Sequence, residues 1–175
     1  MKIDRVELFA LRLPLRTPFH SGSTTTDFRD LGVLRLTDED GRIGVGEITP
    51  YPDPVAPPLD DLIAAFEGGA RDQLLEAEIF DHGLTLETPL PAAVESAIDI
   101  ALLDLLARRE EIRVADLIGT SVQEQIAVNA TITAHDPDEV AALGEHAVQA
   151  GFQTIKLKVG FSSDDRARLE ALRDA

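Results

Sequence analysis

The 175-residue chain contains no cysteine. Disulfides, thiolate metal sites and cysteine nucleophiles are therefore excluded within it. It also lacks any apolar run near the roughly 18 residues that suggest a membrane span, and its charged, alternating N-terminus is unlike a signal peptide. Because 44% of its residues are apolar, the chain can bury a core, and we expect a folded cytoplasmic protein.

Positive charge is scarce as well. Sixteen lysines and arginines stand against 32 acidic residues, giving a formal net charge of -16. This excess argues against nucleic acid and anionic membranes as partners. Only Lys2, Lys156 and Lys158 are lysines. The composition fits an acidic enzyme from an organism whose codons favour arginine, or a protein adapted to high salt, and both interpretations stay open.

The first half of the chain begins with strand patterns. Residues 2–15 alternate and predict a strand, while the Pro-, Gly-, Ser- and Thr-rich segment 14–30 predicts a long mobile loop. Two further runs, 31–37 and 42–48, flank the turn sequence "DEDG" and predict a hairpin. These elements predict a three-stranded antiparallel sheet.

Helical patterns follow the proline-rich break at 50–58. Residues 59–77 predict one or two helices, interrupted at Gly68 and Gly69. The segment 91–112 has an apolar stripe of helical period and predicts the strongest helix of the chain. Strands followed by helices indicate an α+β domain, which we expect to span residues 1–125.

Beyond residue 125 the pattern changes to strand, helix, strand and helix. The strands are expected at 126–132 and 152–160, and Asp136 is expected to cap the helix between them. Such alternation is typical of a parallel sheet or barrel. A complete (β/α)8 barrel takes about 250 residues. We therefore expect residues 126–175 to be the start of a barrel domain, in a truncated chain or one completed by another polypeptide.

Four stretches, in this order, carry a family resemblance: "GVGEITPYP" (44–52), "VESAIDIALLDLLAR" (94–108), "IAVNATIT" (126–133) and "GFQTIKLKVG" (151–160). Together they resemble the enolase superfamily, and its muconate-lactonizing branch most closely. The resemblance implies a capping domain over a (β/α)7β barrel. Within the branch the chain looks most like o-succinylbenzoate synthase, a carbon-oxygen lyase of menaquinone biosynthesis. Dipeptide epimerases and muconate cycloisomerases share these stretches and remain alternatives, as does a non-catalytic binding module.

The motif "KLK" supplies the expected chemistry. Strand alternation puts Ile155, Leu157 and Val159 on one face and the two lysines, Lys156 and Lys158, on the other. The resemblance implies that Lys158 removes a proton next to a carboxylate and that Lys156 tunes it. A lysine is a base only when neutral, and a second ammonium group nearby favours the neutral form. The alternative is a pair of solvated lysines on an edge strand.

Five further residues are candidate substrate contacts: Thr131, Thr133, His20, Ser21 and Arg29. The threonines end the first barrel strand, where β-propensity alone would also explain them. The histidine and serine belong to segment 17–23, which resembles the specificity loop of the family. The arginine could bind a substrate carboxylate or pair with Asp27 or Asp30.

The resemblance also implies Mg²⁺, held by three carboxylates on the third, fourth and fifth barrel strands, with a second lysine opposite the first. Those strands are not in these 175 residues, so no metal ligand is assigned here. We expect a small-molecule carboxylate as substrate. The chain alone is expected to be inactive and to self-associate through its incomplete barrel.

Overall fold

The computed structural model describes residues 1–21, 24–50, 56–79, 86–87, 89–119, 123–160 and 163–175. It divides into two compact units. The first comprises Met1–Leu13 and Arg29–Val122, and the second comprises Pro14–Phe28 and Gln123–Ala175. Each unit has a hydrophobic core of its own. The division of the chain at residue 125 into a capping and a barrel domain stays a prediction.

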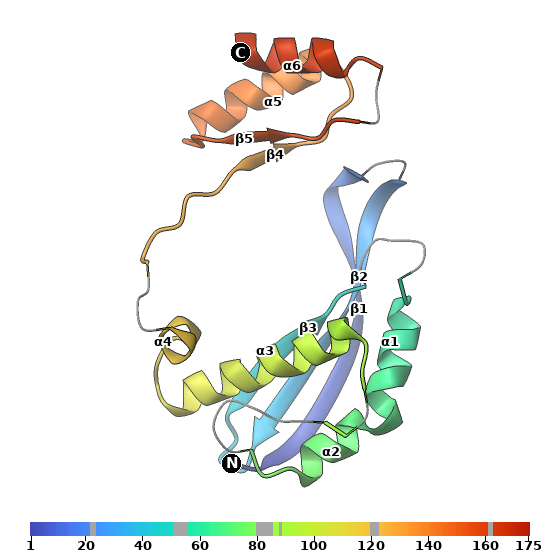
Figure 1. The fold of residues 1–175 in the computed structure, drawn as a ribbon, viewed down its shortest axis with the longest axis vertical. Coiled ribbons are helices and arrows are strands. Elements are labelled where there is room, and N and C mark those ends of the chain that lie inside the picture. The colour runs from blue at the N-terminus through green and yellow to red at the C-terminus, as the bar shows by residue number, and fades with distance from the viewer. Residues whose placement is uncertain (22–23, 51–55, 80–85, 88, 120–122, 161–162) are drawn as a thin grey trace. The chain divides into compact units, whose positions relative to one another are not determined.

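The sheet has three strands, in the order β1 (Ile3–Ser21), β2 (Thr24–Asp38) and β3 (Ile43–Ile48) (Figure 1). Strands β2 and β3 are antiparallel. The inward side chains of β3 alternate with exposed ones, as expected of a sheet with one covered face. The predicted three-stranded antiparallel sheet is confirmed.

The prediction of a long loop over residues 14–30 is wrong, because the described part of this segment continues β1 and β2. Strand β1 lies at the edge of the sheet, where prolines such as Pro14 and Pro18 are tolerated although they lack an N–H. The threonines and Phe28 favour extended backbone. Arg12 and Asp30 also join the two strands through two hydrogen bonds of 2.6 and 2.7 Å.

The first unit has helices in both predicted segments: α1 (Leu59–Ala65), the π-helical turn η1 (Phe66–Ala70), α2 (Arg71–Glu76) and α3 (Ala92–Arg109). A short helix, α4 (Val114–Ile118), follows them. The interruption between α1 and α2 comes from Gly69, whose φ of 152° is outside the helical region. Only glycine adopts such an angle readily. The predicted break therefore lies at the second of the two glycines.

Helix α3 covers the inner face of the sheet and packs closely on β3 (Figure 1). The backbones approach so closely that a Cβ atom at Gly46 would overlap the carbonyl oxygen of Ala97, and one at Gly44 would overlap that of Ala101. The predicted apolar stripe of α3 is buried, and it consists of Val94, Ala97, Ile98, Ala101, Leu102 and Leu105; Ala107 is buried as well. The stripe packs with Leu34, Leu36 and Phe66 in the core of the unit.

The second unit contains the parallel strands β4 (Ala130–Ile132) and β5 (Ile155–Leu157), each followed by a helix, α5 (Pro137–Gln149) and α6 (Asp165–Asp174). The β-α-β-α order is as predicted, but the strands are shorter. The residues expected to begin the first strand are outside the ladder, and Ile126 and Val128 are 77% and 67% exposed. Both helices lie on the same side of the strand pair (Figure 1).

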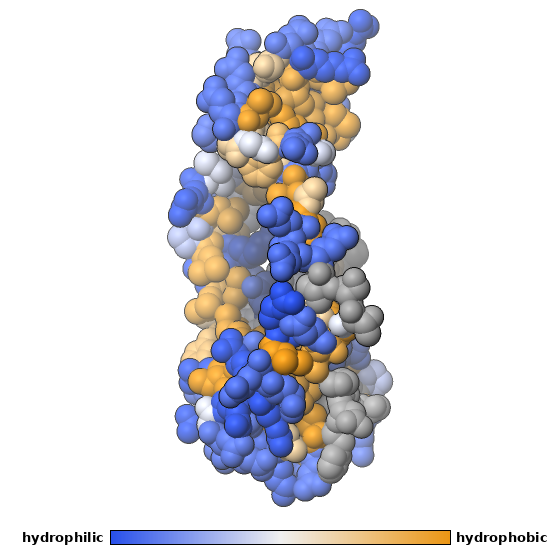
Figure 2. Space-filling model, turned by 90° about the vertical axis from the view of Figure 1, so that its left-hand side faces the viewer, coloured by the Kyte–Doolittle hydropathy of each residue, from blue (hydrophilic) through white to orange (hydrophobic). Residues whose placement is uncertain are grey.

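Hydrophobic residues reach the surface between hydrophilic ones in both units (Figure 2). None of the helices in the described part of the chain is long and apolar enough to cross a membrane.

Candidate functional site

Lys158 lies directly after β5, at the carboxyl end of the parallel strand pair. Its backbone N–H donates to the carbonyl oxygen of Ile132 at 3.1 Å, so the ladder extends to this residue. The chain then turns at Gly160, which has a φ of 99°. Because this left-handed conformation favours glycine, the sequence "KVG" ends the strand here and leaves the lysine at its rim.

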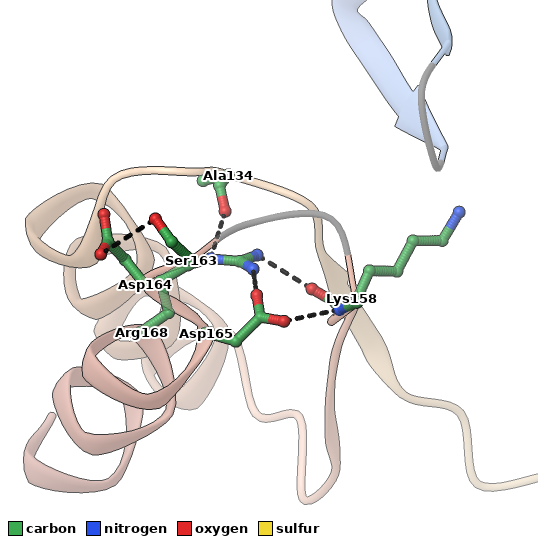
Figure 3. A network of polar contacts seen from close by, with 7 residues as sticks. Ala134, Lys158, Ser163, Asp164, Asp165 and Arg168 are labelled. Carbon is green, nitrogen blue, oxygen red and sulfur yellow. Dashed lines mark hydrogen bonds and ion pairs between the residues drawn. The ribbon is translucent and has the colours of Figure 1, made fainter.

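The side chain of Lys158 points away from α6, toward the hairpin segment Pro14–Phe28 of the same unit, where β1 and β2 meet (Figure 3). Its ammonium nitrogen lies 4.3 Å from the centre of the Phe19 ring. An aromatic ring face attracts a cation at this distance. The contact therefore holds the half-buried lysine in one orientation against the hairpin of its own unit.

Lys156 lies within β5, opposite Thr131 of β4, and its side chain is exposed. Ile155 and Leu157 are half-buried and pack on the core of the unit, as the alternation predicted. Val159 was expected on the same covered face, but it is 56% exposed. The strand ends before it, so the alternation no longer applies.

Arg168 of α6 is a neighbour of the site that the sequence reasoning missed. Its side chain is fully buried. It donates to the carbonyl oxygens of Ala134 and Lys158 at 3.0 and 2.9 Å, and to a carboxylate oxygen of Asp165 at 2.6 Å (Figure 3). One signal was available. Arg168 precedes the half-buried Leu172 by four residues, so it occupies the inward stripe of an amphipathic helix, where an apolar residue is usual.

The two candidate threonines lie in the same unit as Lys158, Thr131 within β4 and Thr133 directly after it. The hydroxyl of Thr131 is exposed and accepts a hydrogen bond from the Asn129 amide at 3.1 Å. Thr133 is half-buried and follows Ile132, whose carbonyl receives the Lys158 N–H. Both are therefore near the strand ends, and their contact with a substrate stays a prediction.

The other three candidates lie on β1 and β2. His20 and Ser21 end β1, and their side chains lie outside the described part of the structure. Arg29 is exposed on β2 in the first unit. Asp30, its suggested partner, is instead hydrogen-bonded by Arg12, which lowers the pKa of that carboxyl group below its usual value.

The described residues contain no group of three histidines, aspartates or glutamates that could hold a metal ion. The arrangement places the amine of Lys158 at the rim of a parallel strand pair. The exposed hydroxyl of Thr131 and the half-buried hydroxyl of Thr133 belong to the same rim.

Comparison with known proteins identifies relatives with epimerase and cycloisomerase activities. The chain is 33% identical to the L-Ala-D/L-Glu epimerase of Escherichia coli, covering 88% of this chain and 46% of the relative. It is 28% identical to the chloromuconate cycloisomerase of Cupriavidus pinatubonensis, covering 100% of this chain and 50% of the relative. The chain thus spans about half the length of the curated relatives it matches.

Comparison with solved structures identifies the same group of relatives as the sequence comparison does. A substrate-liganded complex of the L-Ala-D/L-Glu epimerase from Bacillus subtilis superposes with a TM-score of 0.84 at 26% identity, covering 99% of this chain and 50% of the other. The family model of the mandelate racemase/muconate lactonizing enzyme N-terminal domain matches residues 4–119. The chain therefore belongs to the mandelate racemase/muconate lactonizing enzyme family of the enolase superfamily, and it carries that family's N-terminal capping domain.

Proposed function

We propose that this chain supplies the capping domain and the first two barrel strands of a Mg²⁺-dependent dipeptide epimerase in which Lys158 is an acid/base. The observation that carries the proposal is the position of Lys158 at the carboxyl end of β5, in a parallel pair with β4. Active sites of barrels are built at this end of the strands. The K-x-K-x-G motif of the superfamily gives the lysine its role.

The first chemical step is common to the branch. A neutral Lys158 amine takes the proton from a carbon next to a carboxylate, and the electron pair of the broken C–H bond moves into that carboxylate. Return of a proton to the opposite face of the carbon inverts its configuration, which is epimerisation. Return to a departing hydroxyl would instead be a dehydration. The product therefore depends on whether a second proton donor faces Lys158 across the substrate or the substrate carries a hydroxyl that can leave.

The relatives favour epimerisation over the lyase reaction of o-succinylbenzoate synthase. The L-Ala-D/L-Glu epimerases of Escherichia coli and Bacillus subtilis are 33% and 29% identical to the chain. By analogy we propose a dipeptide with a C-terminal carboxylate, such as L-Ala-L-Glu, as substrate. Thr131, Thr133 and the hairpin that carries His20 and Ser21 are proposed to contact it. Mg²⁺ would be held by carboxylates on later barrel strands, and the second lysine would also come from a later strand.

The test uses the intact enzyme with Mg²⁺ in D₂O. L-Ala-L-Glu is followed by proton NMR for loss of the α-proton signal and appearance of the L-Ala-D-Glu epimer. Exchange with epimer formation supports the proposal. Turnover of the hydroxy-acid substrate of o-succinylbenzoate synthase alone would instead assign the lyase activity. Turnover of a muconate alone would assign the cycloisomerase activity. Dipeptide binding without exchange would indicate a binding module.

A matched control separates the acid/base role from a general effect of removing lysine. Lys2 is exposed in the first unit, where it pairs with Glu78 at 3.7 Å. Lys2→Ala should exchange the α-proton at the wild-type rate, whereas Lys158→Ala should exchange it at least about 10²-fold more slowly. Equal rates in the two variants would contradict the assignment of Lys158.

A further inference from the structure

The strongest unexplained feature of the second unit is the burial of Arg168. Its side chain has no exposed surface, whereas Arg166, two residues earlier on the same helix, is 90% exposed and pairs with Glu170. Burying a guanidinium group is unfavourable unless its donors are well satisfied. An apolar residue would fill the same place without that cost, so the hydrogen bonds of Arg168 should explain why it is there.

Those hydrogen bonds join the ends of both parallel strands. Nε donates to the carbonyl oxygen of Ala134, just after β4, and Nη2 donates to that of Lys158, just after β5. The guanidinium is planar and rigid, so two bonds from its fork fix the directions of both carbonyl groups. One side chain of α6 therefore sets the relative position of the two strand ends.

Asp165 completes the arrangement. One of its carboxylate oxygens accepts from Nη1 of Arg168 at 2.6 Å, and the other accepts from the backbone N–H of Gly160 at 2.6 Å (Figure 3). The short segment from Lys158 to Gly160 is thus held at its first carbonyl by the arginine and at its last N–H by the aspartate. The opposite charges of the pair compensate each other at this buried position.

We propose that Arg168 is a positioning residue for Lys158, acting with Asp165 on the backbone from which the lysine side chain extends. The inference rests on the proposed acid/base role of Lys158. The carbonyl that Arg168 binds and the side chain of Lys158 share one Cα atom, so a shift of the backbone at that atom would displace the ammonium group. A displacement of about 1 Å costs on the order of 10²-fold in rate.

The kinetic test compares Arg168→Lys and Arg168→Met with the matched controls Arg166→Lys and Arg166→Met in the intact enzyme. A lysine keeps the charge beside Asp165 but lacks the planar fork that binds both carbonyl groups. With L-Ala-L-Glu, kcat per folded molecule should fall about 10- to 100-fold in the Arg168 variants, with KM changed less than about threefold. The Arg166 variants should match the wild type.

A purely structural role would lower the folded fraction without changing kcat per folded molecule. The folded fraction is therefore measured by circular dichroism for each variant. Values of kcat within about threefold of the wild type in folded Arg168→Lys would overturn the proposal. Failure of both Arg168 variants to fold would also overturn it, because the residue would then be required for folding itself.

A second measurement needs no substrate. Amide hydrogen exchange by mass spectrometry should be faster in peptides covering residues 155–160 in Arg168→Lys than in Arg166→Lys. Unchanged exchange there would refute the positioning role even if Lys158 is catalytic. If exchange increases but neither wild type nor variants act on dipeptides, the positioning role stands and the proposed function fails.

Discussion

Two lysines that are two residues apart in one strand lie in different surroundings. Lys156 is exposed, whereas Lys158 is half-buried with its ammonium group 4.3 Å from the Phe19 ring centre. Among the described residues, the ring contact at the strand end belongs to Lys158. At the scale of single residues, the two positions should therefore differ in what their loss does to catalysis.

Lys158→Ala should lower the rate of α-proton exchange by at least about 10²-fold, because positioned general bases contribute about 10² to 10⁴-fold. Lys156→Met should lower it less, since it leaves the group that carries the proton in place. The measurement is the NMR exchange rate of both variants in the intact enzyme. A Lys158→Ala variant that keeps more than about a tenth of the wild-type rate would contradict the expected loss.

Gly46 allows the backbones of β3 and α3 to touch. Gly46→Ala should destabilise the first unit by about 1–3 kcal/mol, because its Cβ would overlap the carbonyl oxygen of Ala97 and force the helix away. Gly68→Ala is the matched control, since a Cβ there meets no atom within 4 Å. Urea unfolding of both variants measures the difference. Equal free energies of unfolding for the two variants would show that α3 can shift on the sheet without loss of stability.

At the scale of elements, α5 has a well-defined start. The carboxylate of Asp136 accepts hydrogen bonds from the N–H groups of Asp138 and Glu139, at 2.9 and 3.0 Å. Asp136→Ala should lower the free energy of unfolding of the second unit by about 1 kcal/mol. Asp138→Ala removes a first-turn carboxylate but no cap, so it should lower the free energy of unfolding by less than Asp136→Ala does. Thermal unfolding of the two variants, followed by helical ellipticity, gives the comparison.

Strands β1 and β2 are joined by the ion pair of Arg12 and Asp30. Its hydrogen bond lowers the pKa of Asp30 below the ordinary 3.8. A depressed folded-state pKa contributes stability above the unfolded value, and this stability is lost as pH falls through the lower value. Thermal midpoints of wild type and Asp30→Asn should therefore differ at pH 6, above the ordinary pKa of 3.8, and converge as the pH falls through the lowered pKa. A constant difference would exclude this linkage.

An element could be predicted from the sequence when the residues that determine it lie within its own segment. Helix α3 could be predicted because its apolar stripe directly encodes the buried face. The strands over 14–30 were missed because prolines and glycines usually mark loops, and their tolerance at a sheet edge depends on the neighbouring strand. The contacts of Arg168 were not predictable in detail, since they join three segments that only the tertiary structure brings together.

At the scale of the whole molecule, exposed apolar residues of the second unit coexist with a net charge of -16. Apolar surface favours association, while like charge opposes it and is screened by salt. The Debye length is about 3 Å at 1 M salt and more than about 10 Å at 0.05 M salt, so the repulsion is screened much more strongly at 1 M. In sedimentation experiments the 175-residue chain should therefore self-associate more at 1 M than at 0.05 M salt. Salt-independent monomers would contradict this.

A matched pair of substitutions locates the surface responsible. Ile126 and Val128 are 77% and 67% exposed in the second unit, and Ile118 is 68% exposed in the first. Val128→Asp should reduce association at high salt, because it puts a charge on the apolar surface next to the parallel strands. Ile118→Asp should leave association unchanged. An equal reduction by both would indicate a general charge effect.

The hairpin segment Pro14–Phe28 belongs to the second unit although it lies early in the chain. This has a consequence for recombination between members of the family. An exchange of genes at the boundary near residue 122 would transfer Phe19 with one parent and Lys158 with the other, although the two side chains are in contact. Chimeras joined at that point would combine the hairpin of one parent with the lysine strand of another, so the ring and the ammonium group that meet here would come from sequences that did not evolve together.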